Sequence, residues 1–181
     1  VIRVRNYLFD IRFFKSVQFE PFVISVGNLR AGGTGKTPFV NYLINQFIAE
    51  HRLAVLSRGY KRSTKGFLLA NPKTQPKEIG DEPMMYHQTY GNKISVAVGE
   101  DRVTAIPNIM YEHPSTKLVI LDDAYQHRSV QPAFNILITD YNNLFTQDYM
   151  LPYGFLREPR SGAKRADVVI VSKCPTDISE T

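Results

Sequence analysis

The stretch that decides the fold is Val26–Pro38, which reads VGNLRAGGTGKTP. It follows a short apolar run and precedes a segment with the apolar spacing of a helix. Glycine is entropically costly in ordered backbone, so a cluster of glycines usually marks backbone that approaches a ligand closely. Backbone N–H groups at a helix start bind anions, while Lys36 can reach nucleotide phosphates and the Thr37 hydroxyl can bind Mg²⁺. The stretch therefore predicts a phosphate-binding loop, whose contacts we assign to Gly32, Gly33, Thr34, Gly35, Lys36 and Thr37.

This loop is a variant. The common spacing G-x-x-x-x-G-K-[ST] places its first glycine where this chain has Arg30. The deviant loop of partitioning ATPases has a signature lysine before the double glycine, and Ala31 occupies that position here. The alternative to a phosphate loop is a flexible turn before a helix, and the strand–loop–helix context argues against it.

Short apolar runs alternate with helical patterns along the chain. Nearly continuous β-branched runs are typical of strands that are buried on both faces. Helices are predicted over Pro38–Glu50, from Asp81 as an N-cap candidate, and from Asp101, where Pro107 interrupts the pattern. The sequence thus predicts an α/β fold, a P-loop NTPase-like, mostly parallel sheet with helices on both faces, and a surface loop over 60–80. The expected strands are Phe22–Val26, Leu53–Ser57, Ile94–Val98, Leu118–Asp122, Asn135–Thr139 and Val168–Ser172.

Carboxylates follow two of these strands. Asp122 and Asp123 end the run LVILD, at the edge where open α/β sheets bind ligands and where a Mg²⁺ ligand is needed. Glu100 and Asp101 follow another strand. From the residues alone, Asp101 is equally a general base for an attacking hydroxyl or an N-cap of the next helix.

Composition narrows the partners without choosing among them. The chain has 181 residues, 22 Lys and Arg against 17 Asp and Glu, and a net charge of +5, which favours anionic partners. Its single cysteine, Cys174, excludes an internal disulfide. No apolar run approaches the roughly 20 residues that span a bilayer. The cations of SRGYKR, Ser57–Arg62, suit an anionic substrate, whereas Ser172-Lys173 is a weak match to a base-binding Asn-Lys-x-Asp motif.

Six stretches together resemble one family. SVGNLRAGGTGKTP, LSRGYKR, GDEP, EDR, LDDAYQH and LPYGFLREP occur in the order found in the tetraacyldisaccharide 4′-kinases, the lipid A 4′-kinases. The resemblance implies ATP-dependent phosphorylation of the 4′-hydroxyl of a tetraacylated glucosamine disaccharide 1-phosphate. It also implies Mg²⁺ and a location on the cytoplasmic face of the Gram-negative inner membrane.

The resemblance further implies roles for single residues. Lys36 and Asp101 become catalytic, and the match favours Asp101 as the general base. Thr37, Asp122 and Asp123 become the metal-associated set. His127 has an alternative role as a hydrogen-bonded structural histidine. The residues implied in substrate or phosphate binding are Arg58, Tyr60, Gln126, His127, Arg157 and Glu158.

The ends of the chain carry two expectations. By pattern alone, the mixed basic and aromatic N-terminal segment favours a helix packed on the domain over an interfacial helix. The resemblance reverses this preference, giving an amphipathic membrane-facing segment at 1–20 and a P-loop kinase domain at 21–181. The family also has a second, C-terminal lobe that this chain lacks, so the chain alone is not expected to be a complete enzyme.

Some residues depart from the family pattern, and two other functions compete. Ala124 replaces a glycine, and Tyr153 and Phe155 stand where alanine and proline are commoner. One rival is a switch or partitioning NTPase that acts as a binding module; the absent signature lysine argues against it. The other is a nucleic-acid-binding domain, which would not need both the glycine loop and the paired aspartates, so no nucleic acid partner is expected. The oligomeric state is not predicted.

Overall fold

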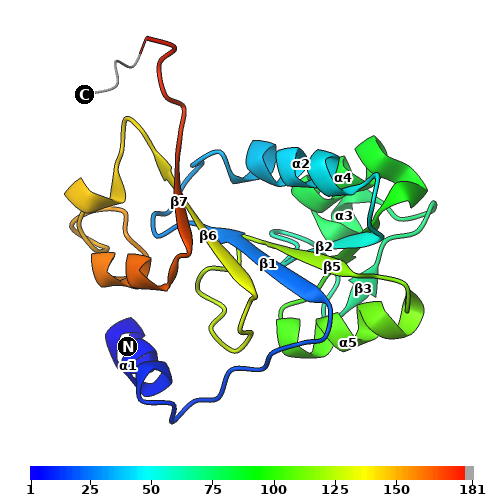
Figure 1. Cartoon of the computed structure of the whole chain (residues 1–181), viewed down its shortest axis with the longest axis horizontal. Helices are drawn as coiled ribbons and strands as arrows, with labels where there is room; N and C mark the ends of the chain where they lie inside the picture. Colours follow the sequence, from blue (N-terminus) through cyan, green and yellow to red (C-terminus); the bar gives the residue numbers. More distant parts are fainter. Residues whose placement is uncertain (178–181) are drawn as a thin grey trace.

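A seven-stranded sheet forms the centre of the molecule (Figure 1), a computed structural model that describes residues 1–177. The strand order is β3-β4-β2-β5-β1-β6-β7, and every neighbouring pair is parallel except β3 with β4. This confirms the predicted mostly parallel α/β sheet. The strands are β1 (Phe22–Gly27), β2 (Leu53–Ser57), β3 (Leu68–Leu69), β4 (Ser95–Val98), β5 (Leu118–Asp122), β6 (Phe134–Asp140) and β7 (Val168–Ser172).

The six predicted strands all form. The central strands are covered on both faces, whereas the edge strand β7 is largely exposed. Every residue of β2 and β5 is buried. On one face, α2 (Lys36–Phe47) and α4 (Asp81–Tyr90) pack through Val40, Ile44 and Tyr86. On the other face, α5 (Arg102–Glu112) packs through Ala105, Ile106 and Ile109. Figure 1 shows these helices on opposite sides of the sheet, as predicted.

Two details of the helices differ from the sequence-based prediction. The helix α2 begins at Lys36 rather than Pro38 and ends at Phe47. The helix α5 continues through Pro107, which lies on its exposed side, while the buried side packs on the sheet. The burial of that side outweighs the backbone hydrogen bond lost at a proline.

The segment 60–80 is more ordered than the surface loop predicted for it. Leu68 and Leu69 form β3, which pairs antiparallel with β4 at the sheet edge. The short helix α3 (Pro76–Ile79) follows, and its Ile79 is fully buried beside Val98. The basic and proline-rich composition of this segment favours a loop, but its two leucines and one isoleucine pack at this edge of the sheet.

The register places the functional strand ends side by side. Val26 lies opposite Asp122, and Leu56 lies opposite Leu121, so β1, β2 and β5 end at one edge of the sheet. The glycine-rich loop leaves this edge from β1. Parallel strands thus bring the glycine loop, the SRGYKR segment and the paired aspartates together, as their positions after the strands predicted.

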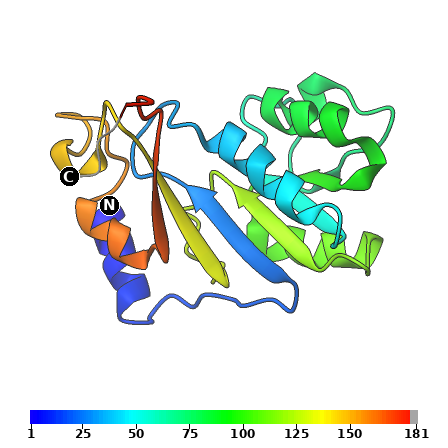
Figure 2. The same cartoon turned by 45° about the horizontal axis from the view of Figure 1, so that its top comes forward.

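The chain begins with α1 (Ile2–Asp10), which lies beside the edge of the sheet that holds β6 and β7 (Figure 2). Three 3₁₀ turns complete the structure: η1 (Gly91–Lys93), η2 (Phe145–Gln147) and η3 (Arg160–Arg165). Within residues 1–177, no helix combines the length and the apolar character required to cross a bilayer.

Candidate active site

The glycine-rich loop wraps around the start of α2. Gly35 is the N-cap of this helix and has a left-handed φ of 79°, a conformation that glycine adopts without strain. Gly32 also has a positive φ, of 117°. The loop therefore directs its backbone toward the positive end of the helix dipole, where an anion is stabilised.

Two residues before this loop hold it in place. A Cβ on Gly27 would lie 2.7 Å from the Cβ of Tyr125, so only glycine allows the segment after β5 to pass this close. The side-chain amide of Asn28 donates to the Thr34 hydroxyl at 2.8 Å. Because that hydroxyl is buried and already paired, Thr34 is placed to contact a ligand through its backbone rather than its side chain.

Lys36 points toward Asp123 across the loop. Its Nζ lies 3.5 Å from one Asp123 carboxylate oxygen, and Arg157 donates to both oxygens of the same carboxylate, at 2.9 and 3.2 Å. Burial would raise the pKa of Asp123, but the hydrogen bonds from Arg157 and the charge of Lys36 outweigh it and hold the pKa below its ordinary value. Asp123 is therefore an ionised group between two cations.

The neighbouring Asp122 has the opposite environment. It is almost fully buried and accepts a 3.0 Å hydrogen bond from the Tyr86 hydroxyl. Burial and the nearby Glu82 raise the pKa of Asp122 to about 6. Its Oδ1 has no hydrogen-bond partner among residues 1–177. A buried carboxylate oxygen without a donor is costly unless a cation completes it.

The start of α4 brings two more acids to the loop. Thr37 donates to the Glu82 carboxylate at 3.2 Å. The predicted N-cap role of Asp81 is wrong, because Gly80, with a φ of 91°, occupies the cap position and Asp81 is the first helical residue. Asp81 is exposed and lines the same cleft as the glycine loop.

These groups surround one cleft, a cavity of about 1070 Å³. It lies between the glycine loop, the ends of β2 and β5, and the start of α4. Its lining includes Gly32, Gly33, Thr34, Gly35, Lys36, Thr37, Arg58, Tyr60, Asp81, Glu82, Asp122, Asp123, Gln126, His127 and Arg157, together with Ile2 and Arg5 of α1. Most of the residues predicted for the site are thus brought together.

Asp101 does not line this cleft. Its Oδ1 accepts the backbone N–H of Val103 at 3.0 Å and its Oδ2 accepts the Thr104 hydroxyl at 2.5 Å, so it is the N-cap of α5. Of the two roles left open by the residues, the structure bears out the cap. Both carboxylate oxygens are bound within the helix, and the role of Asp101 as general base stays a prediction.

Glu158 is also absent from the cleft lining. Its carboxylate is fully buried and accepts from Asn6, Gln126 and Arg165, each at 2.9 Å. Direct contact with a substrate, expected from the motif, does not fit this burial. Glu158 instead positions Gln126, which lines the cleft, and ties α1 to the domain through Asn6.

Two arginines lie near His127: Arg58, which lines the cleft, and Arg102, which does not. Arg102 is almost fully buried, and among the described residues its Nε and Nη2 have no partner. Burial, followed by the nearby charge of Arg58, lowers the pKa of Arg102 to about 10. Burial and these two arginines also lower the pKa of His127 to about 4, so its ring is neutral near pH 7. The part of the cleft around Arg58 therefore favours an anion.

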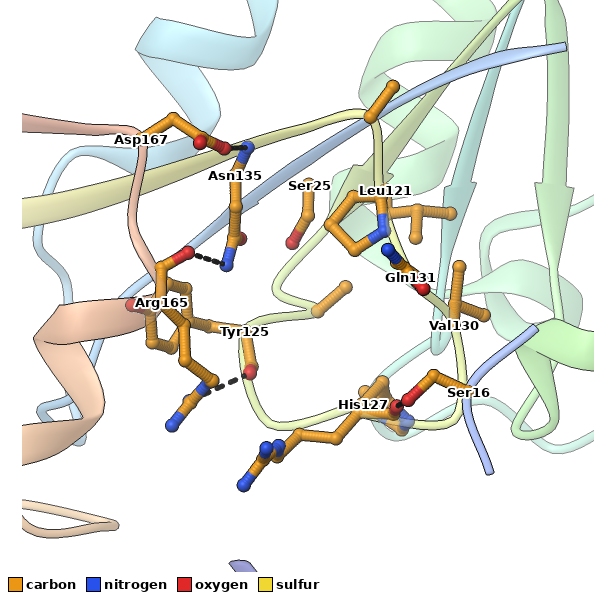
Figure 3. A pocket seen from close by; sticks show the side chains of 14 residues that line it. Ser16, Ser25, Leu121, Tyr125, His127, Val130, Gln131, Asn135, Arg165 and Asp167 are labelled. Carbon is orange, nitrogen blue, oxygen red and sulfur yellow. Dashed lines mark hydrogen bonds between the residues drawn. The ribbon is translucent and has the colours of Figure 1, made fainter. Parts of the chain in front are cut away.

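His127 also lines a second, smaller cavity of about 310 Å³ on the α5 side of the sheet (Figure 3). Figure 3 shows Ser25, Tyr125 and Asn135 around this space, with Arg165 at its side. His127 therefore lines both cavities. This position fits substrate binding and the alternative role as a structural histidine equally well.

The comparisons with known proteins agree with this geometry. A model of the family described as tetraacyldisaccharide-1-P 4′-kinase matches residues 1–181. The chain belongs to this family. The tetraacyldisaccharide 4′-kinase of Flavobacterium psychrophilum is 49% identical over 180 residues, which cover 99% of this chain and 52% of that protein. The corresponding protein of Bacteroides thetaiotaomicron is 48% identical over 179 residues, covering 98% and 47%.

A solved structure of a family member supports the fold. LpxK from Aquifex aeolicus, described as an "apo" form in complex with ATP, has a TM-score of 0.85 and 40% identity, covering 94% of this chain and 54% of that chain. The chain thus spans about half the length of the family members that it matches. The family and its P-loop fold, both predicted from the motifs, are confirmed.

Four residues of the site escaped the sequence-based reasoning: Asn28, Arg5, Glu82 and Arg102. Asn28 and Arg5 act across more than 120 residues, through Arg157 and the backbone of Gln126. Glu82 and Arg102 lie inside the quoted motifs GDEP and EDR. These motifs were a usable signal, but only the fold shows which of their side chains lies beside the glycine loop.

Proposed function

We propose that this chain is the nucleotide-binding half of a kinase that transfers the γ-phosphoryl group of ATP to the 4′-hydroxyl of a tetraacylated glucosamine disaccharide 1-phosphate. The observation that carries the proposal is the cleft itself, where Lys36 and Thr37 of the glycine loop face four carboxylates, Asp81, Glu82, Asp122 and Asp123. Membership of the kinase family supports the reaction, and the ATP complex of the Aquifex aeolicus relative supports the nucleotide.

The glycine loop would bind the triphosphate. Backbone N–H groups of residues 32–37 converge at the start of α2, where the helix dipole stabilises negative charge. Lys36 would neutralise the charge that develops on the transferred group. Its present contact with Asp123, 3.5 Å away, keeps the ammonium directed into the cleft.

The residues beside this loop fit Mg²⁺. The unpartnered Oδ1 of Asp122 and the hydroxyl of Thr37 are oxygen ligands of the kind that Mg²⁺ binds. No group of three or more acidic, His or Cys side chains forms a complete metal cage within residues 1–177. This agrees with Mg²⁺ sites in phosphoryl-transfer enzymes, which use one or two carboxylates and the substrate phosphates. A bound Mg²⁺ would stabilise charge on the phosphates.

Asp81 is the best-placed general base. Asp81 is exposed and lines the cleft next to Glu82, which contacts the glycine loop. A base must reach the proton of the attacking hydroxyl, and Asp101 has both oxygens bound to its own helix. We therefore assign the proton transfer to Asp81.

The cationic end of the cleft would receive the acceptor. Arg58 and Tyr60 line the cleft, and the unpartnered nitrogens of Arg102 lie near enough to Arg58 for their charges to interact. A phosphate on the disaccharide would accept hydrogen bonds from Arg58 and Tyr60. The volume of about 1070 Å³ lies at the upper end of the range of roughly 300–1000 Å³ that is typical of ligand sites.

The segment at 1–20 would contact the membrane that holds this lipid, on the cytoplasmic face of the inner membrane. The helix α1 turns its polar side to the protein, with Asn6 buried against Glu158 and Arg5 donating to the backbone of Gln126. Its Val4 and Tyr7 are exposed, whereas Ile2, Leu8 and Phe9 are half-buried. A helix that docks by its polar face presents its apolar face to another phase, as interfacial helices do.

Phosphoryl transfer tests the proposal. The chain would be joined to the remaining half of the Flavobacterium psychrophilum relative and incubated with γ-labelled ATP, with and without tetraacyl disaccharide 1-phosphate. We expect label on the lipid. Free phosphate released equally with and without lipid, from a protein that binds ATP, would refute the kinase assignment and favour a nucleotide switch.

A further inference from the structure

The segment Tyr149–Phe155, here called the aromatic loop, exposes four large apolar side chains within seven residues. Tyr149 is 66% exposed, Leu151 56%, Tyr153 92% and Phe155 54%. Single exposed aromatic residues are normal on soluble proteins, but a contiguous group usually marks an interaction surface. Neither the nucleotide nor the metal chemistry of the cleft uses these side chains.

The aromatic loop is held rigidly. The Asp148 carboxylate accepts the backbone N–H groups of Tyr149 and Phe155, at 2.8 and 3.1 Å, and the Nε of Arg30 at 2.9 Å. A Cβ on Gly154 would clash with the Asp148 carboxylate and with the Tyr149 backbone. The apolar side chains are therefore displayed by a fixed turn, which lowers the entropic cost of inserting them into a partner.

The surroundings of the loop are cationic. Arg30 stacks over the Phe155 ring at 4.6 Å, and Arg160 stacks over the Tyr149 ring at 5.1 Å. Over residues 141–166, both carboxylates are ion-paired inside the protein, Asp148 with Arg30 and Glu158 with Arg165. Within the described chain, Arg160 and Lys164 have no carboxylate partner and remain exposed. Apolar tips flanked by unpaired cations complement an anionic lipid surface.

The position of the loop supports the same partner. The backbone N–H of Ala31, in the glycine loop, donates to the Phe155 carbonyl at 2.8 Å, so the aromatic loop adjoins the rim of the cleft. Figures 1 and 2 both place the segment around residues 150–155 at the same end of the molecule as α1. The apolar face of α1 and the aromatic loop are thus two separate elements at one end.

We propose that the aromatic loop is a second membrane-contacting element, which inserts Leu151 and Tyr153 into the boundary between headgroups and acyl chains of an anionic bilayer. Arg160 then lies at the level of the lipid phosphates. The inference does not depend on phosphoryl transfer, because it concerns only the binding of the protein to lipid. Two contacts, α1 and the loop, fix the orientation of the cleft relative to the membrane.

The chain contains no tryptophan, which permits a direct test. Tyr153→Trp gives a single reporter at the tip of the loop, and Tyr111→Trp gives a matched control on α5, where the side chain is 83% exposed. Each variant is mixed with vesicles of phosphatidylethanolamine and phosphatidylglycerol, with and without brominated acyl chains. We expect a blue shift and bromine quenching for Tyr153→Trp and neither effect for Tyr111→Trp. Unchanged emission of Tyr153→Trp overturns the proposal.

A third reporter, Tyr7→Trp on α1, separates this proposal from that of the N-terminal segment. If Tyr7→Trp responds to vesicles and Tyr153→Trp does not, the helix alone binds lipid and the loop proposal is wrong. The double variant Leu151→Ser/Tyr153→Ser should partition into the same vesicles at least about tenfold more weakly than the unchanged chain. Its affinity for ATP should stay unchanged, because neither side chain lines the cleft; equal partitioning contradicts the proposal.

Discussion

The starts of α4 and α5 are alike in sequence and opposite in use. Each carries two adjacent acids, Asp81 and Glu82 at α4, and Glu100 and Asp101 at α5. At α4 a glycine caps the helix, so both acids face the cleft. At α5 the aspartate is itself the cap, and Glu100 binds Arg62 at 2.7 Å. The acids of α4 are available to a ligand because Gly80 caps that helix, whereas Asp101 must cap α5 itself.

A large effect on catalysis should come from replacing Lys36, the cation that the acids of the cleft face. Lys36→Ala removes the ammonium that would stabilise the transferred phosphoryl group, and we expect kcat to fall by at least about 10²–10³-fold. The measurement is labelled phosphoryl transfer in the joined protein described above. Lys65→Ala is the matched control, because Lys65 is exposed and does not line the cleft. Equal activity of both variants would remove Lys36 from the mechanism.

The ionised carboxylate of Asp122 should lower the free energy of unfolding when no metal is bound. Its pKa in the folded protein, about 6, is higher than in the unfolded chain. The protonated carboxyl group of Asp122 therefore stabilises the folded protein at low pH. This stabilisation is lost as the pH rises through about 6 and the group ionises. In EDTA at pH 8, Asp122→Asn should raise the free energy of unfolding by about 1–3 kcal/mol, and this gain should vanish near pH 4.

Urea unfolding of both proteins at the two pH values measures this difference. A variant that is less stable than the unchanged chain at pH 8 would show that the buried carboxylate is already compensated. Mg²⁺ should stabilise the unchanged chain more than the variant, because Asp122 is an expected ligand.

Asp101 should behave in the opposite way. Asp101→Ala leaves the N–H of Val103 and the hydroxyl of Thr104 without their acceptor, so it should lower the free energy of unfolding by about 1 kcal/mol. The loss should be the same with and without Mg²⁺. Chemical denaturation measures it, and Asp101→Asn, which keeps a capping oxygen, should recover most of the stability.

The smallest effect should come from Glu100. Its carboxylate holds Arg62 and the backbone of Gly66, and the hydrogen bond from Arg62 lowers its pKa. Because the carboxylate is exposed, Glu100→Gln should cost less than about 1 kcal/mol at pH 7. The cost should fall as the pH drops through the lowered pKa, where the carboxylate is protonated in both states. A larger loss would mean that this pair organises the 60–80 segment.

The same comparison explains what the sequence could predict. The strands were predictable because β2 and β5 are buried on both faces, which requires apolar residues at each position. The glycine loop was predictable because its function depends on local backbone between one strand and one helix. Cap assignments were not: Asp81 and Asp101 both precede helical patterns, and only the φ of Gly80 separates them.

Long-range contacts account for the remaining misses. Glu158 lies in a motif, yet its carboxylate is a buried hub that joins Asn6, Gln126 and Arg165. Asn28, which precedes the glycine loop, links Thr34 to Arg157. Neither contact leaves a periodic signal in the sequence, because its partners lie on distant segments of the chain.

The most direct test of the account compares Asp81→Asn with Asp101→Asn in labelled phosphoryl transfer, at saturating ATP and lipid acceptor. Both variants remove one charge and keep a side chain of the same size. We predict that Asp81→Asn lowers kcat by about 10²–10⁴-fold, while Asp101→Asn stays within a few-fold of the unchanged protein. The reverse result, with Asp101→Asn inactive and Asp81→Asn active, would contradict the assignment of the cleft acids.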